Sequence, residues 1–279
     1  MKRNLSLKNV MLVTCIIAFG CQKIDRPVMG DYPPDTNPPG GPLKFYAAMD
    51  GTTVDSIRAN FGSNTNVSFV DGTSSEAMEA GSDGYVVYPS ANDFGKSTSF
   101  TISFWLKKDG PNAAGGGTTF TFGLSTTTDI WTAMNIFLEF EDAGNPSSKD
   151  SAAAKFYLMD QWFEFVKTST IDKRLPHVLD GQWHHLAFVY DATSSTVTTY
   201  VDGTVPSNLP ADFGKFTNNG GVVNLTSSAG LVLGGPGHFA VGKTPDSWMG
   251  NFNGGIDQFR LYGEALSAAD IQTIFNNHE

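Results

Sequence analysis

The stretch "DGQWHHLAFVYDATSSTVTTYVDG", from Asp180 to Gly203, decides the fold. In a strand, Trp183 and His185 share one face, and Leu186 and Phe188 share the other. Apolar neighbours on both faces indicate a strand that is covered on both sides, followed by a second strand and an Asp-Gly turn. We therefore interpret Trp183 and His185 as structural residues. The alternative, a metal site, needs converging ligands, and the remaining histidines stand at no ligand spacing.

The composition is typical of a β-protein, because the 279 residues are 40% hydrophobic, only 16% charged, and include 30 glycines. This length fits one large all-β domain or at most two small ones. The formal net charge is −10, and no Lys/Arg cluster occurs beyond the first residues. Nucleic acid is therefore excluded as an expected partner, because its binding requires basic residues that neutralise phosphates.

The N-terminal segment reads as a targeting signal. Residues 1–20 combine basic residues with an apolar run that is too short to span a bilayer, which predicts a signal peptide. The ending "AFGC" resembles a bacterial lipobox, with Gly20 before the cleavage site and Cys21 as the lipid-bearing residue. A plain secretory signal with an incidental cysteine is the alternative. Residues 21–42, rich in Pro and Gly, predict a semi-extended tether, and the folded domain is expected over residues 43–279.

The alternation of side chains between two faces, typical of strands, continues along the rest of the chain. Runs such as "SFTISFWLK", "KFYLMDQWFEFV" and "IDQFRLY" are separated by Gly, Asn, Asp and Ser. Many short strands at this spacing predict an all-β, antiparallel two-sheet jelly-roll β-sandwich. One short C-terminal helix is expected in "ALSAADIQTIFNN", where Ser267 is a good N-cap and Asp270 completes a capping box.

Several of these segments, in this order, resemble the laminin-G-like jelly roll of the concanavalin A-like lectin/glucanase superfamily. They include "KFYAAMDGTTVDSIRANFG", "SFTISFWLK", "DGQWHHLAFVYD" and "FNGGIDQFRLYGEALSAADIQTIF", and the resemblance covers Leu43 to Phe275. It implies the jelly-roll fold and makes carbohydrate the favoured ligand, although this fold hosts many functions.

The resemblance also implies one structural Ca²⁺. Asp50 in "MDGTTVD" and Asp257 in "GGID" match the positions that bring carboxylates together near the first and last strands. Ca²⁺ takes about six to eight oxygen ligands, so Asp55 or backbone carbonyls would add to them. The alternative is that Asp50 begins a turn and Asp257 caps a strand.

Paired acids raise the possibility of a glycoside hydrolase. "FLEFED" places Glu139 and Glu141 on one face, and "MDQWFEF" places Asp160, Trp162 and Glu164 on one face. A retaining mechanism requires two carboxyl groups about 5–5.5 Å apart. The longer acidic stretch of the family's hydrolases is absent, however, and alternating acids are ordinary on the wet face of a strand. Hydrolysis is therefore a second alternative.

Tryptophans are the candidate sugar-binding residues, because sugar rings stack on exposed aromatic side chains. The pattern does not assign Trp105, Trp131, Trp162 or Trp248 to the core, and Trp131, Trp162 and Trp248 are the candidates for a carbohydrate platform. The alternative is that each of them covers an edge of the sandwich.

Together these observations predict a lipid-anchored, extracytoplasmic, lectin-like protein that binds a glycan without cleaving it. It would lie at the outer membrane or cell surface of a Gram-negative bacterium, with a periplasmic orientation left open, and would contact the membrane through its N-terminal lipid. A protein-binding adhesion or scaffold module is the first alternative. The identity of the glycan and the oligomeric state stay open.

Overall fold

A computed structural model of the protein describes residues 40–111, 117–126, 136–141 and 147–278. The expected signal peptide, Cys21, almost all of the expected tether, and Trp131 lie outside the described residues. The first strand begins at Leu43.

The described strands form one strongly curled, almost entirely antiparallel sheet and one separate pair. The strand order of the sheet is β12-β11-β4-β15-β3-β13-β5-β6-β8-β9, with β1 beside β15, β2 beside β3, and β14 parallel to β5. The strands of this sheet are β1 (Leu43–Ala47), β2 (Ser63–Asp71), β3 (Glu76–Tyr88), β4 (Phe100–Asp109), β5 (Thr118–Thr126), β6 (Ile136–Phe140), β8 (Ala154–Leu158), β9 (Gln161–Phe165), β11 (Asp180–Asp191), β12 (Thr196–Val201), β13 (Ser228–Leu233), β14 (Met249–Asn251) and β15 (Gly254–Tyr262). The separate pair is β7 (Ser151–Ala152) and β10 (Leu175–Pro176).

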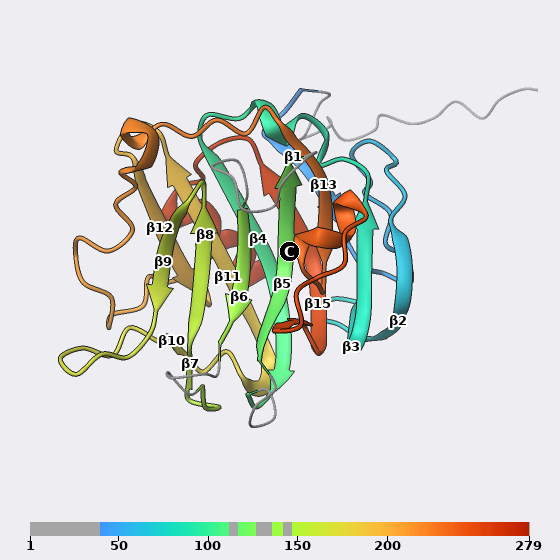
Figure 1. Cartoon of the computed structure of the whole chain (residues 1–279), viewed down its shortest axis with the longest axis horizontal. Helices are drawn as coiled ribbons and strands as arrows, with labels where there is room; N and C mark the ends of the chain where they lie inside the picture. Colours follow the sequence, from blue (N-terminus) through green and yellow to red (C-terminus); the bar gives the residue numbers. More distant parts are fainter. Residues whose placement is uncertain (1–39, 112–116, 127–135, 142–146, 279) are drawn as a thin grey trace, which may run out of the picture. The chain divides into compact units, whose positions relative to one another are not determined.

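The curl turns the sheet into the two layers of a jelly-roll β-sandwich, which confirms the predicted fold class. Figure 1 shows β5, β6, β8 and β9 in front of β11, β12, β4 and β15. Strand β3 links the layers, because residues 78–80 pair with β15 while residues 86–88 pair with β13. Aromatic rings from both layers meet in the core, where Phe156 of β8 stacks on Phe188 of β11 at 4.4 Å. Burying one such ring contributes about 1.5–3 kcal/mol.

The decisive strand, β11, lies between β12 and β4 and is covered on both sides, as its sequence predicts. Leu186 and Phe188 face the main core. The other face, with His185, lies under the C-terminal helix α2 (Ala268–Asn277). Ser267 and Asp270 form the expected capping box of α2.

Two tryptophans have environments that the sequence pattern did not specify. Trp105 is a core residue, only 2% exposed, because α2 covers it: its ring lies 5.6 Å from that of Phe275. Trp183 is half-buried rather than fully buried. Its indole lies against Gly255, where a Cβ atom would come within 2.6 Å of the ring. Across the described ranges, no helix is long and apolar enough to cross a membrane.

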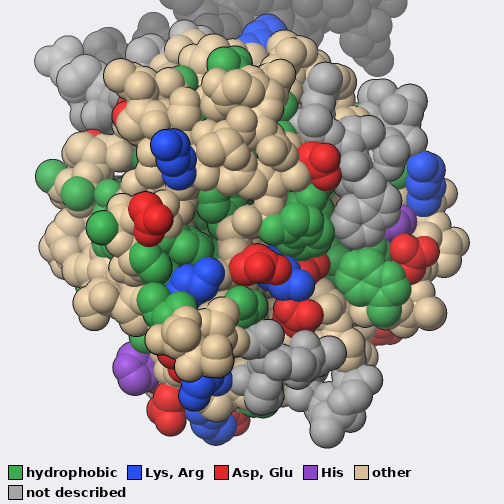
Figure 2. Space-filling model, turned by 60° about the vertical axis from the view of Figure 1, so that its left-hand side comes forward, with side chains coloured by type: hydrophobic (Ala, Val, Ile, Leu, Met, Phe, Trp, Pro, Cys, Tyr) green, Lys and Arg blue, Asp and Glu red, His purple; other side chains and the backbone are tan. Residues whose placement is uncertain are grey.

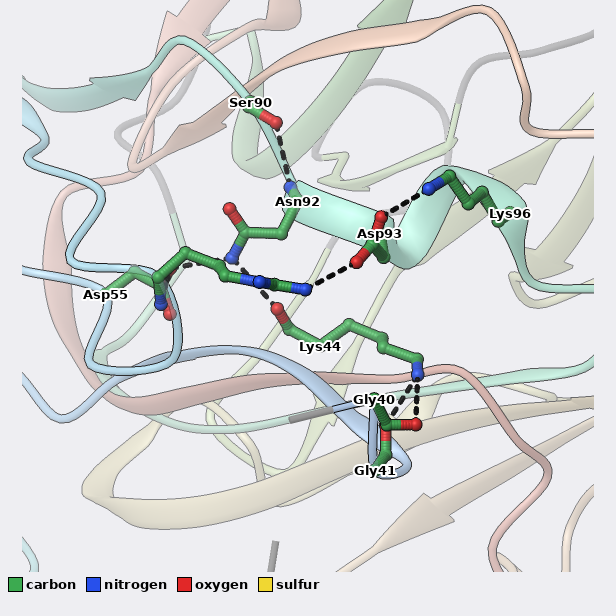
Figure 3. Close-up of polar contacts among 9 residues, drawn as sticks. Gly40, Gly41, Lys44, Asp55, Ser90, Asn92, Asp93 and Lys96 are labelled. Atoms are coloured by element: carbon green, nitrogen blue, oxygen red, sulfur yellow. Dashed lines mark hydrogen bonds and ion pairs between the residues drawn. The ribbon is translucent and has the colours of Figure 1, made fainter. Parts of the chain in front are cut away.

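The remaining helical turns are short: η1 (Asn92–Lys96), η2 (Asn218–Gly221) and η3 (Gly237–Val241). Helix η1 belongs to a polar network that fastens the loop after β1 (Figure 3). The Asn92 amide donates to Asp55 Oδ2 at 2.7 Å and to the Lys44 carbonyl at 2.9 Å. Asp55 is fully buried and also accepts from the backbone N–H groups of Tyr46, Ile57 and Arg58. Asp55 is therefore used as a structural carboxylate.

Candidate carbohydrate-binding face

The outer face of β5, β6, β8 and β9 carries a connected set of aromatic side chains, which we call the aromatic face. Strand register places Phe137 beside Tyr157 and Tyr157 beside Trp162. A bulge in β5 between Phe120 and Phe122 turns Phe120 outward, opposite Glu139, instead of onto the core face that Phe122 occupies. The aromatic face consists of Phe120, Phe137, Tyr157, Trp162 and Trp248.

The rings of the aromatic face support one another. Phe137 and Tyr157 stack with centroids 4.5 Å apart, and Tyr157 meets Trp162 edge-on at 4.8 Å. Phe120 lies 5.4 Å from Phe137 and 6.0 Å from Trp248. The three inner rings are buried, whereas Trp162 is 40% and Trp248 45% exposed. Two accessible indoles are thus held by a fixed row of rings, which suits stacking against a sugar.

A carboxylate cluster, defined as Glu139, Glu141 and Glu164 around Lys155, lies beside these rings on the same face. The register aligns Glu139, Lys155 and Glu164 across β6, β8 and β9. Lys155 Nζ lies 2.9 Å from Glu141 Oε2, 3.9 Å from Glu164 Oε1 and 4.0 Å from Glu139 Oε1. It also lies 5.5 Å from the Trp162 ring centroid, in a cation–π contact.

Figure 2 brings forward the side of the molecule on which β8 and β9 lie. It shows acidic and basic side chains next to one another, with hydrophobic side chains around them. This face therefore offers both of the elements that sugar recognition uses, apolar rings and fixed polar groups.

Glu139 is the most unusual member of the carboxylate cluster. The residue is 3% exposed, and its Oε2 has no hydrogen-bond partner among the described residues. Burial raises the pKa of Glu139 to about 7, against the opposing effect of Lys155, and Glu141 and Glu164 raise it further. The sequence pattern identified these three glutamates. It missed Lys155, whose only signal is a lysine within the apolar run "AAAKFYL".

A shallow cavity of about 320 Å³ adjoins the aromatic face at Trp162. Its walls include Glu164 and, from beyond β9, Lys173, Asp212 and Lys215. Asp160, the other acid of the predicted set, is exposed at the β8–β9 turn, where Tyr157 Oη donates to it at 3.3 Å. The structure thus brings Trp162 and Glu164 to a cavity large enough for a single sugar unit.

A larger cleft of about 890 Å³ lies elsewhere, among β2, β3, β4 and the β14–β15 turn. Its walls carry Glu79, Lys107, Lys108 and Asn251, and none of the described residues that line it is aromatic. Burial raises the pKa of Glu79 despite the two lysines. Without rings for stacking, this cleft is a poorer candidate for sugars than the aromatic face.

The two candidate calcium ligands lie near one another. Asp257 is 1% exposed, and its Oδ2 accepts from the Thr73 N–H and hydroxyl, both at 2.8 Å. Asp257 Oδ1 has no partner among the described residues. Burial raises the pKa of Asp257; the hydrogen bonds from Thr73 oppose this, and the nearby Asp50 carboxylate raises the pKa further. Asp50 is exposed and accepts from the Glu76 N–H at 3.2 Å.

These donors fit a cation that prefers oxygen, with two carboxylates supplemented by backbone oxygens and water. Within the part of the chain that the structure describes, no group of three or more His, Cys, Asp or Glu residues is placed to hold a metal ion. Asp55 adds no ligand, because its carboxylate is occupied by the network in Figure 3.

His185 of β11 has a buried structural environment. His185 Nε2 lies 2.8 Å from Ser103 Oγ, and both residues are fully buried. Burial, aided by Arg260 and opposed by Asp202, lowers the pKa of His185 to about 4. This Ser–His pair lies on the face that α2 covers, so it is closed to a substrate.

The chain matches one family model and is similar in fold to several solved structures. A family model described as the concanavalin A-like lectin/glucanases superfamily matches residues 80–272. No curated protein sequence is significantly similar to this chain. Among solved structures, domain 4 of an extracellular arabinanase from Geobacillus stearothermophilus, in complex with arabinotriose, is similar with a TM-score of 0.54 and 18% identity, over 84% of this chain and 98% of that one.

Two toxin structures are similar over part of their length. The binding domain of Paraclostridial Mosquitocidal Protein 1 has a TM-score of 0.54 and 16% identity, over 85% of this chain and 52% of that one. Botulinum neurotoxin type C, whose cell entry depends on interaction with two ganglioside molecules, has a TM-score of 0.53 and 15% identity, over 85% of this chain and 51% of that one. The chain therefore spans about half the length of these toxin chains. At such identities, the likeness shows the fold alone.

Proposed function

Because the chain belongs to the concanavalin A-like lectin/glucanases superfamily, we propose that it binds a glycan on the aromatic face. The observation that carries this proposal is the pair of exposed indoles, Trp162 and Trp248, at the two ends of a buried aromatic row. A structural neighbour with the same fold was solved with arabinotriose, which supports a carbohydrate ligand.

Binding without cleavage is the favoured form of this function. Hydrolysis requires one carboxyl group that protonates the leaving oxygen and a second that attacks or activates water. Glu139 is the observation in favour of a hydrolase, because a carboxyl group with a pKa of about 7 suits a general acid. Its Oε2 is buried, however, and Glu141 is held by Lys155. We therefore propose a lectin-like protein, with glycoside hydrolysis as the second candidate.

The proposal is tested by glycan-array binding of the domain from Leu43 to Glu279 and of alanine variants. Trp162→Ala and Trp248→Ala should each weaken binding of the best array ligand by roughly 2- to 13-fold, because an aromatic contact contributes about 0.5–1.5 kcal/mol. Phe61→Ala is the matched control, because Phe61 is 71% exposed and precedes β2, far along the sheet from β9.

Three outcomes separate the candidates. Binding that survives in both Trp variants contradicts the aromatic face as the site. Release of reducing sugar at an enzymatic rate, lost in Glu139→Gln, favours hydrolysis. No glycan binding at all across the array favours the adhesion or scaffold alternative, in which the same face contacts a protein.

We also propose that Asp50 and Asp257 hold a structural Ca²⁺. The supporting observation is the buried Asp257 Oδ1, which has no hydrogen-bond partner among the described residues and lies near the Asp50 carboxylate. A cation is favourable at such a position. A bound Ca²⁺ would join the loop after β1 to β15 and so stabilise the fold. It would take no part in the stacking at the aromatic face.

Finally, we propose that the domain is attached to a membrane through lipid on Cys21, at the outer membrane or cell surface. Support comes from the sequence of residues 1–21, with its basic start, short apolar run and lipobox-like end. A surface-anchored domain on a tether suits a protein that collects or retains glycans.

A further inference from the structure

We propose that the aromatic face selects uncharged glycans and discriminates against glycans that carry carboxylate groups. This inference rests on the proposed function and names the class of sugar that the same site accepts. The carrying observation is the carboxylate cluster beside Trp162, in which one ammonium group is shared by three carboxylates.

Lys155 lies 5.5 Å from the centroid of the exposed Trp162 ring, but its charge is already neutralised by carboxylates. Its closest carboxylate oxygen, on Glu141, lies at 2.9 Å, and oxygens of Glu139 and Glu164 lie at 4.0 and 3.9 Å. To pair with an acidic sugar, Lys155 would have to leave these partners. That exchange leaves partly buried carboxylates without a counter-ion, which is costly.

Glu139, the buried member of the carboxylate cluster, brings no positive charge to the site. It is almost fully buried, and Oε2 has no hydrogen-bond donor among the described residues. A sugar carboxylate over Trp162 would face the side chains of Glu141 and Glu164, which already share the ammonium group of Lys155. Sugar hydroxyl groups, in contrast, can donate hydrogen bonds to Glu141 and Glu164.

The other charged groups around Trp162 do not make the site favourable for a sugar carboxylate. Lys173 and Lys215 line the adjoining cavity together with Glu164 and Asp212, and Lys173 lies 5.2 Å over the Phe213 ring. Asp160 adds another acid at the β8–β9 turn. Neither the described aromatic face nor the described cavity lining includes an arginine, the side chain best suited to bind a carboxylate in a bidentate manner.

The experiment compares neutral polysaccharides with their carboxylated forms. Laminarin and galactan would each be used before and after oxidation of their primary C6 hydroxyl groups to carboxylates, which keeps the glycosidic linkages unchanged. Binding to the domain from Leu43 to Glu279 would be measured by affinity electrophoresis and calorimetry. We expect oxidation to weaken the binding of whichever neutral polymer binds by about tenfold or more, as like-charge contacts imply.

A double variant tests the role of the carboxylate cluster itself. Glu141→Gln/Glu164→Gln releases Lys155 from two of its three partners, so binding of the oxidised polymer should improve several-fold relative to the neutral one. The control Glu264→Gln/Asp83→Asn changes the net charge by the same amount at exposed positions outside this face and should leave the ratio unchanged.

The outcomes distinguish the two levels of the proposal. If the oxidised polymer binds as tightly as the neutral one, or more tightly, charge selection is refuted while glycan binding stands. The same holds if the double variant and its control have equal ratios. If neither form of any polymer binds, the proposed function fails, and the selectivity fails with it.

Discussion

At the scale of single residues, Glu139 links the candidate site to stability. Burial raises its pKa from 4.5 to about 7, so between these values the folded protein binds a proton that the unfolded chain has released. The contribution of Glu139 to the free energy of unfolding is therefore fully present below about pH 4.5 and is lost as the pH rises through about 7. The loss amounts to at most about 3 kcal/mol.

We predict that Glu139→Gln flattens this decline. Urea unfolding of both proteins at about pH 5 and pH 8 measures it through the free energy of unfolding. Burial tends to lower the pKa of His184, but its hydrogen bonds with Asp202 and Asp180 outweigh burial and raise it. The stability that His184 contributes is therefore also lost as the pH rises. This loss is the same in both proteins, so it cancels when their free energies of unfolding are compared. Equal pH dependence of the two proteins would contradict the assignment.

Asp257 is the residue that decides the calcium proposal. We predict that Ca²⁺ raises the melting temperature, because a ligand of the folded state stabilises it by about 2.7 kcal/mol at a concentration of one hundred times Kd. Asp257→Asn should abolish the difference between Ca²⁺ and a chelator, whereas Asp83→Asn, at an exposed position away from Asp50, should retain it. An unchanged melting temperature of the original protein in Ca²⁺ and in chelator would refute the site.

At the scale of elements, periodicity predicted most of what the structure contains. The alternation in β11 identified a strand covered on both sides, and the Ser267–Asp270 spacing identified the start of α2. Asp202 and Gly203 form the expected two-residue turn, with φ of 49° and 74°, as the mirror-image turn types require. These features depend on local spacing, so a single sequence is sufficient to find them.

Elements that meet across the fold were harder to predict. Trp105 belongs to the core because α2, more than 160 residues later, packs over it. The outward position of Phe120 depends on a bulge that "TTFTFGLS" does not reveal, because simple alternation would place it on the same face as Phe122. Lys155 joins three glutamates only through the register of β6, β8 and β9. Contacts of this kind are set by pairing between strands, which periodicity within one strand does not specify.

At the scale of the whole molecule, the two layers of the described domain differ in what their outer faces expose. One outer face is covered by a helix, and the other carries exposed aromatic and charged side chains. The outer face of β4 and β11 is closed by α2, so its Ser–His pair is inaccessible. The outer face of β6, β8 and β9 keeps exposed indoles and charged groups. A lectin-like role therefore follows more readily from the second face.

The last prediction concerns that attachment. We predict that Cys21 carries lipid, so cells that produce the protein should incorporate a fatty-acid analogue into it, and Cys21→Ala should abolish the label. The apolar run before Cys21 is too short to anchor the chain by itself, so the variant should also leave the membrane fraction. Cys15→Ala is the matched control, since it removes the other cysteine of the chain and should keep both the label and the membrane association. Equal labelling of Cys21→Ala and the original protein would show that Cys21 is an incidental cysteine in a plain secretory signal.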